Sequence, residues 1–196
     1  MSNSTTPEAK TAGEIIVRIQ PTPNPNALKF VMNAPVKTEG KATFTRPSEA
    51  VGIRLAEDLF AIEDVRQLHF FENVVTVTHS MEADVDTLQL EVTAVLQSRM
   101  PLHDPNFLVE EERKKVDRSG LPPEIQKIEE ILDSTVRMYL QGDGGDIEIV
   151  SLKGNQLEVR YEGACGTCPS STSATLEAIQ GILREQFDPE LDVIPV

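Results

Sequence analysis

Tryptophan is absent from this 196-residue chain, and aromatic residues make up only 5% of it. Its cores must therefore rest mainly on isoleucine, leucine and valine. No apolar run approaches the roughly 18 residues of a transmembrane helix. Basic residues are also scarce, because 18 Lys and Arg face 32 Asp and Glu, for a net charge of −14. Nucleic acids and anionic membranes require basic surfaces, so we expect neither as a partner.

Cysteine is nearly absent too, since Cys165 and Cys168 are the only two thiols. The N-terminal stretch MSNSTTPEAKTAGE has no apolar segment typical of a secretory signal. It also has no arginine before Arg18 and carries Glu8 and Glu14, whereas a mitochondrial presequence is arginine-rich and poor in acids. We therefore interpret residues 1–13 as a disordered lead-in and expect a cytoplasmic protein, in which a C-x-x-C pair more often binds metal or is redox-active than structural.

A change of composition divides the chain between residues 104 and 121. This stretch contains Pro105, a charge run at residues 110–115 and Gly120, followed by two prolines. Chain breakers mixed with solvated charge are typical of a linker between domains. We therefore predict an α+β protein of two small domains, at residues 14–103 and 122–196, joined by a charged linker that contains proline and glycine.

The N-terminal domain alternates strand and helix patterns. Short β-branched runs predict strands at residues 15–19, 27–32, 65–72 and 74–80. Apolar residues at helical spacing predict helices at residues 48–62, with Ser48 as the N-cap, and 84–100. The segment QPTPNPN at residues 20–26 predicts a stiff loop, because each proline fixes its own backbone and restricts the residue before it.

The C-terminal domain shows a different order. A helix is expected from Pro123 to Leu140, followed by a hairpin of residues 146–152 and 156–161 around Gly154. The C-x-x-C then precedes a helix at residues 171–187 and a last strand at 192–196. Both cysteines thus follow a strand and stand at the start of a helix, where the helix dipole favours thiolate over thiol.

A thiolate pair suits redox chemistry or metal binding. Thioredoxin-type dithiols also stand at a helix start, but within a βαβ unit and not after a tight hairpin. Structural zinc requires four nitrogen or sulfur ligands and iron–sulfur clusters usually four thiolates, whereas this chain supplies two. A complete all-thiolate site therefore needs two chains. A zinc-bridged structural dimer and a dithiol oxidoreductase remain alternatives to a cluster site.

Two segments resemble one known family. GGDIEIVSLKGNQLEVRYEGACGTCPSSTSATLEAIQGIL, residues 144–183, closely resembles the C-terminal domain of NifU-like (Nfu-type) iron–sulfur cluster proteins. IQPTPNPNALKF, residues 19–30, resembles the start of the N-terminal domain that some Nfu proteins carry. In the last helix this chain has Glu177, Ala178 and Ile179 where the family often has a basic residue and then Gly-Ile. This difference leaves the cysteines untouched but changes the surface near them.

The resemblance implies a carrier and not an enzyme. It implies a [4Fe–4S] cluster bound between two protomers by Cys165 and Cys168, in a loop that Gly163, Ala164, Gly166, Thr167 and Pro169 shape. Implied partners are apo iron–sulfur proteins as recipients, upstream cluster-assembly proteins and a second copy of the chain. We interpret the N-terminal domain as a docking module. Its histidines, His69 and His79, are interpreted with His103 as ordinary strand and loop residues.

Overall fold

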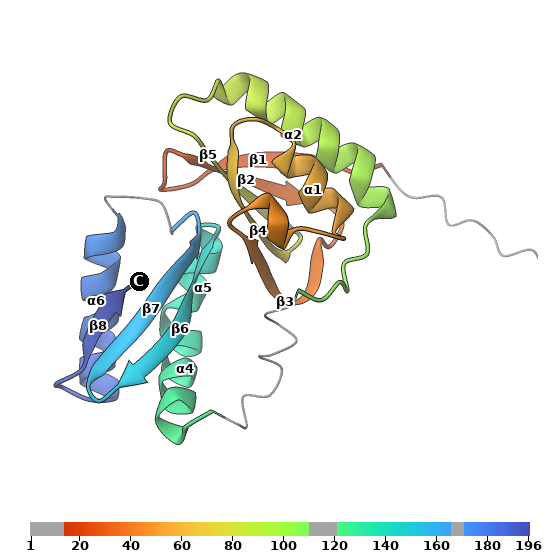
Figure 1. Cartoon of the computed structure of the whole chain (residues 1–196). Coiled ribbons are helices and arrows are strands. Elements are labelled where there is room, and N and C mark those ends of the chain that lie inside the picture. Colours follow the sequence, from red (N-terminus) through yellow and green to blue (C-terminus); the bar gives the residue numbers. More distant parts are fainter. Residues whose placement is uncertain (1–13, 110–120, 166–170) are drawn as a thin grey trace, which may run out of the picture.

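The computed structural model describes residues 14–109, 121–165 and 171–196. Figure 1 shows two domains, each with its own sheet and helices, which confirms the predicted α+β class with two domains. The lead-in at residues 1–13 and most of the expected linker lie outside the described residues, so those boundaries stay a prediction. None of the described helices is long and apolar enough to cross a membrane.

The N-terminal domain is a five-stranded antiparallel sheet with strand order β1-β2-β5-β4-β3. Helices α1 (Arg54–Phe60) and α2 (Val85–Arg99) cover one face of it (Figure 1). Alternate strand residues such as Phe30, Phe70 and Val75 are fully buried in the core that these helices close. The strands are β1 (Val17–Pro21), β2 (Ala27–Met32), β3 (Lys37–Phe44), β4 (Val65–Glu72) and β5 (Val74–His79).

The helix predicted from Ser48 begins later than expected. Pro47–Glu49 forms only a short 3-10 helix, and α1 starts at Arg54. Gly52 between them has a φ of +88°, in the left-handed region that ends a right-handed helix. Val51, which lies within the predicted helix at residues 48–62, is outside α1 and is 75% exposed. The prediction of α2 is confirmed, and Asp84 caps its first turn by accepting a hydrogen bond from Thr87 N.

Strand β3 was not predicted from the sequence. Its segment KTEGKATF alternates charged and polar residues around Gly40, which gives a weak strand pattern. It lies at the edge of the sheet and pairs with β4, with a register shift between Lys37 and Lys41. Lysines and bulges are common on edge strands, where they discourage pairing with other chains. On this edge strand, Lys41 also reaches the second domain, where it pairs with Asp146.

The C-terminal domain has a three-stranded sheet of order β6-β7-β8. Strands β6 (Gly145–Lys153) and β7 (Gln156–Gly163) form the predicted hairpin, with Gly154 in its turn. Helix α6 (Ser171–Gln186) crosses over to β8 (Asp192–Pro195), which therefore runs parallel to β7. Buried apolar residues from the helices and strands form a second core, including Ile128, Leu132, Ile147, Leu157, Val159, Ile179 and Leu183.

The single helix expected from Pro123 to Leu140 is two helices. Helix α4 (Pro123–Thr135) ends before Val136, which has a φ of −97°, and α5 (Arg137–Gly142) follows. The hydroxyls of Ser134 and Thr135 donate to carbonyls one turn earlier, Glu130 O at 2.9 Å and Ile131 O at 2.5 Å. Such bonds compete with the helical ladder and bend it, a tendency that an apolar pattern cannot reveal.

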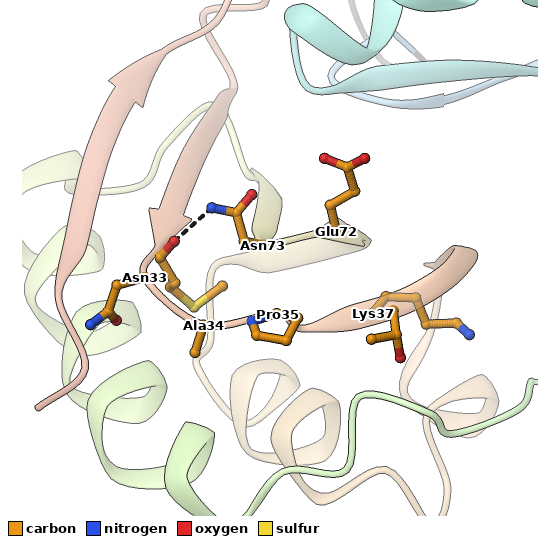
Figure 2. Close-up of a pocket in the computed structure, with 8 residues that line it drawn as sticks. Asn33, Ala34, Pro35, Lys37, Glu72 and Asn73 are labelled. Atoms are coloured by element: carbon orange, nitrogen blue, oxygen red, sulfur yellow. Dashed lines mark hydrogen bonds between the residues drawn. The ribbon is translucent and has the colours of Figure 1, made fainter. Parts of the chain in front are cut away.

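A shallow pocket of about 300 Å³ lies on the N-terminal domain (Figure 2). The β2–β3 connection and the β4–β5 turn line it, and Asn73 Nδ2 donates to Met32 O across 2.6 Å at its edge. Its lining residues are Met32, Asn33, Ala34, Pro35, Lys37, Thr38, Glu72 and Asn73. None of them is a cysteine or histidine, so the pocket offers no soft-metal ligand.

Candidate functional site

Cys165 lies two residues beyond the end of β7, at the end of the β6–β7 hairpin opposite its turn. Its side chain is partly buried and packs against the second core. Cys168 lies outside the described residues, as do Gly166, Thr167 and Pro169. The predicted ligand pair is therefore described for Cys165 alone, and helix α6 begins shortly after the pair, at Ser171, as expected.

Two glycines make the room that Cys165 occupies. Gly145 pairs with Gly163 at the open end of the hairpin, and Ala164 N donates to Gly144 O at 3.1 Å. A Cβ atom added to Gly145 would overlap Cys165 Sγ and lie 3.0 Å from its Cβ. Cys165 thus packs directly against β6. Gly145 was not among the predicted site residues, although the adjacent glycines 144 and 145 are a visible signal in the sequence.

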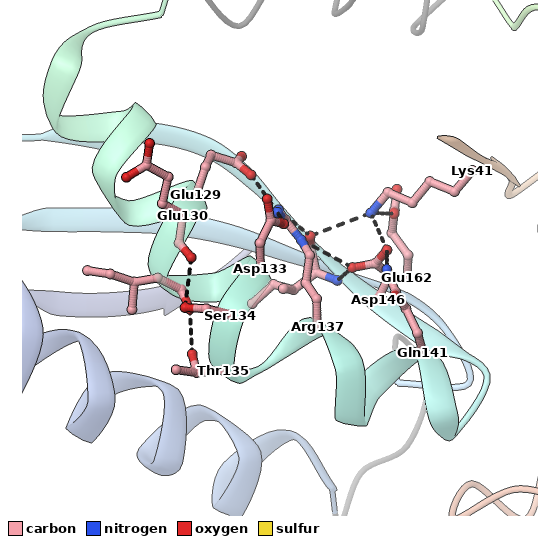
Figure 3. Close-up of polar contacts among 12 residues, drawn as sticks. Lys41, Glu129, Glu130, Asp133, Ser134, Thr135, Arg137, Gln141, Asp146 and Glu162 are labelled. Carbon is pink, nitrogen blue, oxygen red and sulfur yellow. Dashed lines mark hydrogen bonds and ion pairs between the residues drawn. The ribbon is translucent and has the colours of Figure 1, made fainter. Parts of the chain in front are cut away.

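An ion-pair network stands beside this loop (Figure 3). Asp146, whose side chain is 2% exposed, lies 3.5 Å from Arg137 Nε and 3.0 Å from Lys41 Nζ. Lys41 also pairs with Glu162 at 2.5 Å. Burial raises the pKa of Asp146, but Lys41 and the hydrogen bonds from Ile147 N and Gln141 lower it more, so the carboxylate stays ionised. The positive charges of Lys41 and Arg137 thus lie against the two carboxylates next to Gly145 and Gly163.

Tyr161 on β7 interacts electrostatically with Cys165. Burial, together with the nearby charge of Cys165, raises the pKa of the Tyr161 phenol to about 12. Its hydroxyl is buried and has no hydrogen-bond partner among the described residues. The phenol therefore remains protonated at neutral pH. Tyrosine at this position carried no signal in the sequence, because alternation only placed it on the inner face of a strand.

The three histidines bond to protein groups. His69 Nδ1 lies 2.8 Å from Thr43 Oγ1, His79 Nδ1 2.8 Å from Ser80 O and His103 Nε2 2.8 Å from Val36 O. Across the described part of the chain, no group of three or more His, Cys, Asp and Glu side chains is placed to hold a metal ion. One chain thus presents the cysteine loop without supplementary ligands among the residues that the structure describes.

Both domains match known families. The NifU-like domain matches residues 128–194, and the N-terminal domain of the Nfu/NifU scaffold proteins matches residues 17–101. The human "NFU1 iron-sulfur cluster scaffold homolog, mitochondrial" is 31% identical over 173 residues, which cover 87% of this chain and 67% of that protein. The chain belongs to the NifU-like (Nfu-type) family. The resemblance expected from the cysteine motif is confirmed.

A second relative of this Nfu-type chain is "NifU-like protein 4, mitochondrial" from Arabidopsis thaliana, 30% identical over 174 residues. The match covers 86% of this chain and 62% of that relative, so the chain spans about two thirds of the length of these relatives. A solution structure of a NifU-like protein from Saccharomyces cerevisiae superposes with a TM-score of 0.43 at 19% identity, over 52% of this chain and 89% of that one.

The cytoplasmic localisation expected from the sequence is contradicted. The human and Arabidopsis relatives are both named as mitochondrial proteins. The expectation rested on the residues before Arg18 and on the need to keep two thiols reduced. Neither observation specifies one compartment, because the cytosol is not the only reducing compartment of a cell. The folds of the two domains do not specify a compartment either.

Proposed function

We propose that this Nfu-type protein carries an iron–sulfur cluster as cargo, holds it between two protomers and transfers it to apo-proteins. Its relatives are named as iron–sulfur cluster scaffolds, and the C-x-x-C motif lies within the matched NifU-like domain. The observation that supports the site most directly is Cys165 itself. It stands partly exposed at the end of a hairpin, with its Sγ in a space that only glycine at position 145 leaves open.

The number of ligands supports the dimer. A [4Fe–4S] cluster binds four thiolates, and each chain contributes Cys165 and Cys168. Two chains related by a two-fold axis complete the set, and this is the commonest symmetry of protein dimers.

Transfer consists of ligand exchange alone: only the bonds between iron and thiolate sulfur break and form. A cysteine thiolate of the recipient attacks an iron of the cluster, and one thiolate of this protein leaves and takes up a proton. Four such exchanges move the cluster with its charge and oxidation state unchanged. The protein is therefore a carrier and not an enzyme. Apo iron–sulfur proteins are its recipients, and upstream cluster-assembly proteins supply the cargo.

Anaerobic reconstitution of the full chain with iron and sulfide tests the proposal. We expect about two irons per chain, visible absorption typical of a cluster, and a shift from monomer to dimer in sedimentation, because the cluster links the two chains. Cys165→Ser and Cys168→Ser should each lower stable loading at least about tenfold, because serine is a poor ligand where soft thiolates are required.

His79→Gln is the control, because it changes a buried polar side chain that lies in the N-terminal domain. It should load normally. A colourless protein that binds one zinc per dimer would favour the structural-dimer alternative. A monomer that retains four irons, or full loading of either serine variant, would contradict the shared site.

A further inference from the structure

The N-terminal sheet has a polar face that turns away from its helices. Thr43, His69, Thr76 and Lys29 are successive cross-strand partners on β3, β4, β5 and β2. Cross-strand partners share a face, and the alternate residues on these strands, such as Phe70, point into the helix-covered core. These four residues, which we call the polar row, therefore occupy the face that no helix of the N-terminal domain covers.

The polar row is nevertheless buried. His69 and Thr76 are each only 1% exposed, whereas the uncovered face of an antiparallel sheet normally lies in water. The end of the β6–β7 hairpin covers them. A Cβ atom added to Gly163 would lie 3.2 Å from His69 Cγ, and one added to Gly144 would lie 2.8 Å from Thr76 Oγ1. Both glycines flank the space that Cys165 occupies.

Asn24, in the proline-rich loop, reaches the residue next to the thiol. Its Nδ2 donates to Ala164 O at 2.9 Å, and Asn24 is 1% exposed. The Oδ1 of the same amide accepts from Asn26 N at 2.9 Å, which fixes the orientation of the side chain. A buried carbonyl that lost this donor would be costly to leave unpaired. The amide of Asn24 therefore holds the backbone directly before Cys165.

Two lysines complete the contact from the other strands. Lys41 Nζ lies 3.0 Å from Asp146 and 2.5 Å from Glu162, which stand beside Gly145 and Gly163. Figure 3 shows Lys41 of the N-terminal domain pointing toward Asp146 and Glu162 of the C-terminal domain. Lys29 Nζ donates to Gly142 O at 2.7 Å. Lys29 thus bonds to Gly142, Lys41 to Asp146 and Glu162, and Asn24 to Ala164, all close to the open end of the β6–β7 hairpin.

The contact between the two domains is polar, and some of its buried groups lack hydrogen bonds. Thr76 Oγ1 and Thr78 Oγ1 are buried without a hydrogen-bond partner among the residues that the structure describes. Unpaired buried hydroxyls disfavour the closed arrangement, and polar interfaces between domains of one chain are typically separable. The two cores lie on either side of it and are built from different segments, residues 30–100 and 128–193.

We propose that the N-terminal domain is a clamp on the open end of the β6–β7 hairpin, formed by Asn24, Lys29, Lys41 and the polar row, which limits access to Cys165 until the domains separate. The occupant of the sheet's polar face is thus the cysteine-loop end of the protein's own C-terminal domain. Its consequence for cargo rests on the proposed function: a recipient's thiolate reaches the cluster faster when the clamp is open. The N-terminal domain then controls release and is more than a docking module.

Thiol alkylation of the apo-protein tests the clamp without any cluster. The full chain carrying Cys168→Ser has Cys165 as its single thiol, and its reaction with iodoacetamide is followed from about pH 7 to about pH 10, so that the plateau above the ordinary thiol pKa of about 8.5 measures access alone. Lys41→Glu places a third carboxylate against Asp146 and Glu162. We expect its plateau rate to rise about tenfold, because a charge-assisted contact becomes a repulsion.

The matched control is Lys153→Glu, an exposed ion-paired lysine at the far end of the same hairpin, which should leave the rate unchanged. Adding Glu162→Lys to Lys41→Glu should bring the rate back toward that of the parent. Asn24→Asp, which keeps the acceptor for Asn26 N but removes the donor to Ala164, should raise the rate about threefold and serves as the test if Lys41→Glu does not fold.

Equal plateau rates for the parent, Lys41→Glu and Asn24→Asp would overturn the clamp, as would an equal rise in Lys153→Glu. Iron content of the reconstituted protein with both cysteines is measured separately. Loss of loading there bears on the proposed function alone, because the alkylation rates contain no contribution from iron.

Discussion

At the scale of single residues, the cysteine site depends on two glycines, which have no side chain. Gly145 has no Cβ, and the space this leaves is taken by Cys165 Sγ. Gly163 has a φ of +60°, and a side chain there would overlap Gly144 O. The position of the thiol is therefore set by close backbone packing at the end of the hairpin.

Gly145→Ala should displace Cys165 and lower cluster loading at least about threefold, at a stability cost of about 1–3 kcal/mol for the forced overlap. Gly181→Ala in α6 is the matched control, since a Cβ there meets nothing within 4 Å. This variant should load normally, and its free energy of unfolding should rise by up to about 1 kcal/mol, because alanine favours the helix. Iron content and urea unfolding measure both effects. Normal loading of Gly145→Ala would show that the loop tolerates the displacement.

At the scale of secondary-structure elements, Arg137 joins three segments of the C-terminal domain. From the start of α5 its guanidinium pairs with Glu129 at 2.6 Å and with Asp133, both on α4, and with Asp146 on β6. Burial lowers the pKa of Arg137, but hydrogen bonds and attraction from these carboxylates raise it more. The guanidinium therefore connects the broken helix pair to the strand that supports the cysteine loop.

Arg137→Leu should destabilise the C-terminal domain by about 3–5 kcal/mol, because it removes the shared cation from Glu129 and Asp146, whose side chains are poorly exposed. Arg160→Leu breaks a pair with Glu148 on the same sheet, but Arg160 is about half exposed, so its cost should be about 0–1 kcal/mol. Denaturant unfolding compares the two variants. Similar losses would mean that the network contributes no more than an ordinary surface ion pair.

At the scale of the whole molecule, His69 reports the contact between domains. Burial lowers its pKa to about 4, and this outweighs the attraction of Glu162, which raises it. Lys41 lowers the pKa and Asp146 raises it, so the charged groups of both domains act on one imidazole. Protonation of His69 is therefore disfavoured while the domains are docked and becomes easy once they separate or unfold.

The pH dependence follows from this shift. The contribution of His69 to stability is complete above its ordinary pKa of about 6.5 and is lost as the pH falls from there toward 4, because the unfolded state binds the proton more readily. Between pH 7 and about pH 5 this loss is about 2 kcal/mol. His69→Gln should lack it, whereas His103→Gln should retain it. Urea unfolding at both pH values measures this loss. The same pH dependence in His69→Gln and in the parent would show that His69 is not its cause.

Local patterns in the sequence were sufficient for most elements. Alternating residues on either side of Gly154 predicted the β6–β7 hairpin, and helical spacing of Leu88, Val92 and Leu96 predicted α2, because these signals arise from neighbours along the chain. Where local chemistry opposed the pattern, prediction failed. Gly52 delayed α1 to Arg54, and the polar segment of β3 was missed because its pairing with β4 makes it a strand.

The sequence by itself determined that Cys165 and Cys168 are the only thiols, that they follow a hairpin and precede a helix, and that one chain supplies half of a four-thiolate set. Only the tertiary structure decided what surrounds Cys165. Asn24 bonds to Ala164 across 140 residues, and Lys41 meets Asp146 across a domain boundary. No periodicity or turn signal encodes such contacts, because they arise when two separately patterned surfaces pack together and exclude water from the groups between them.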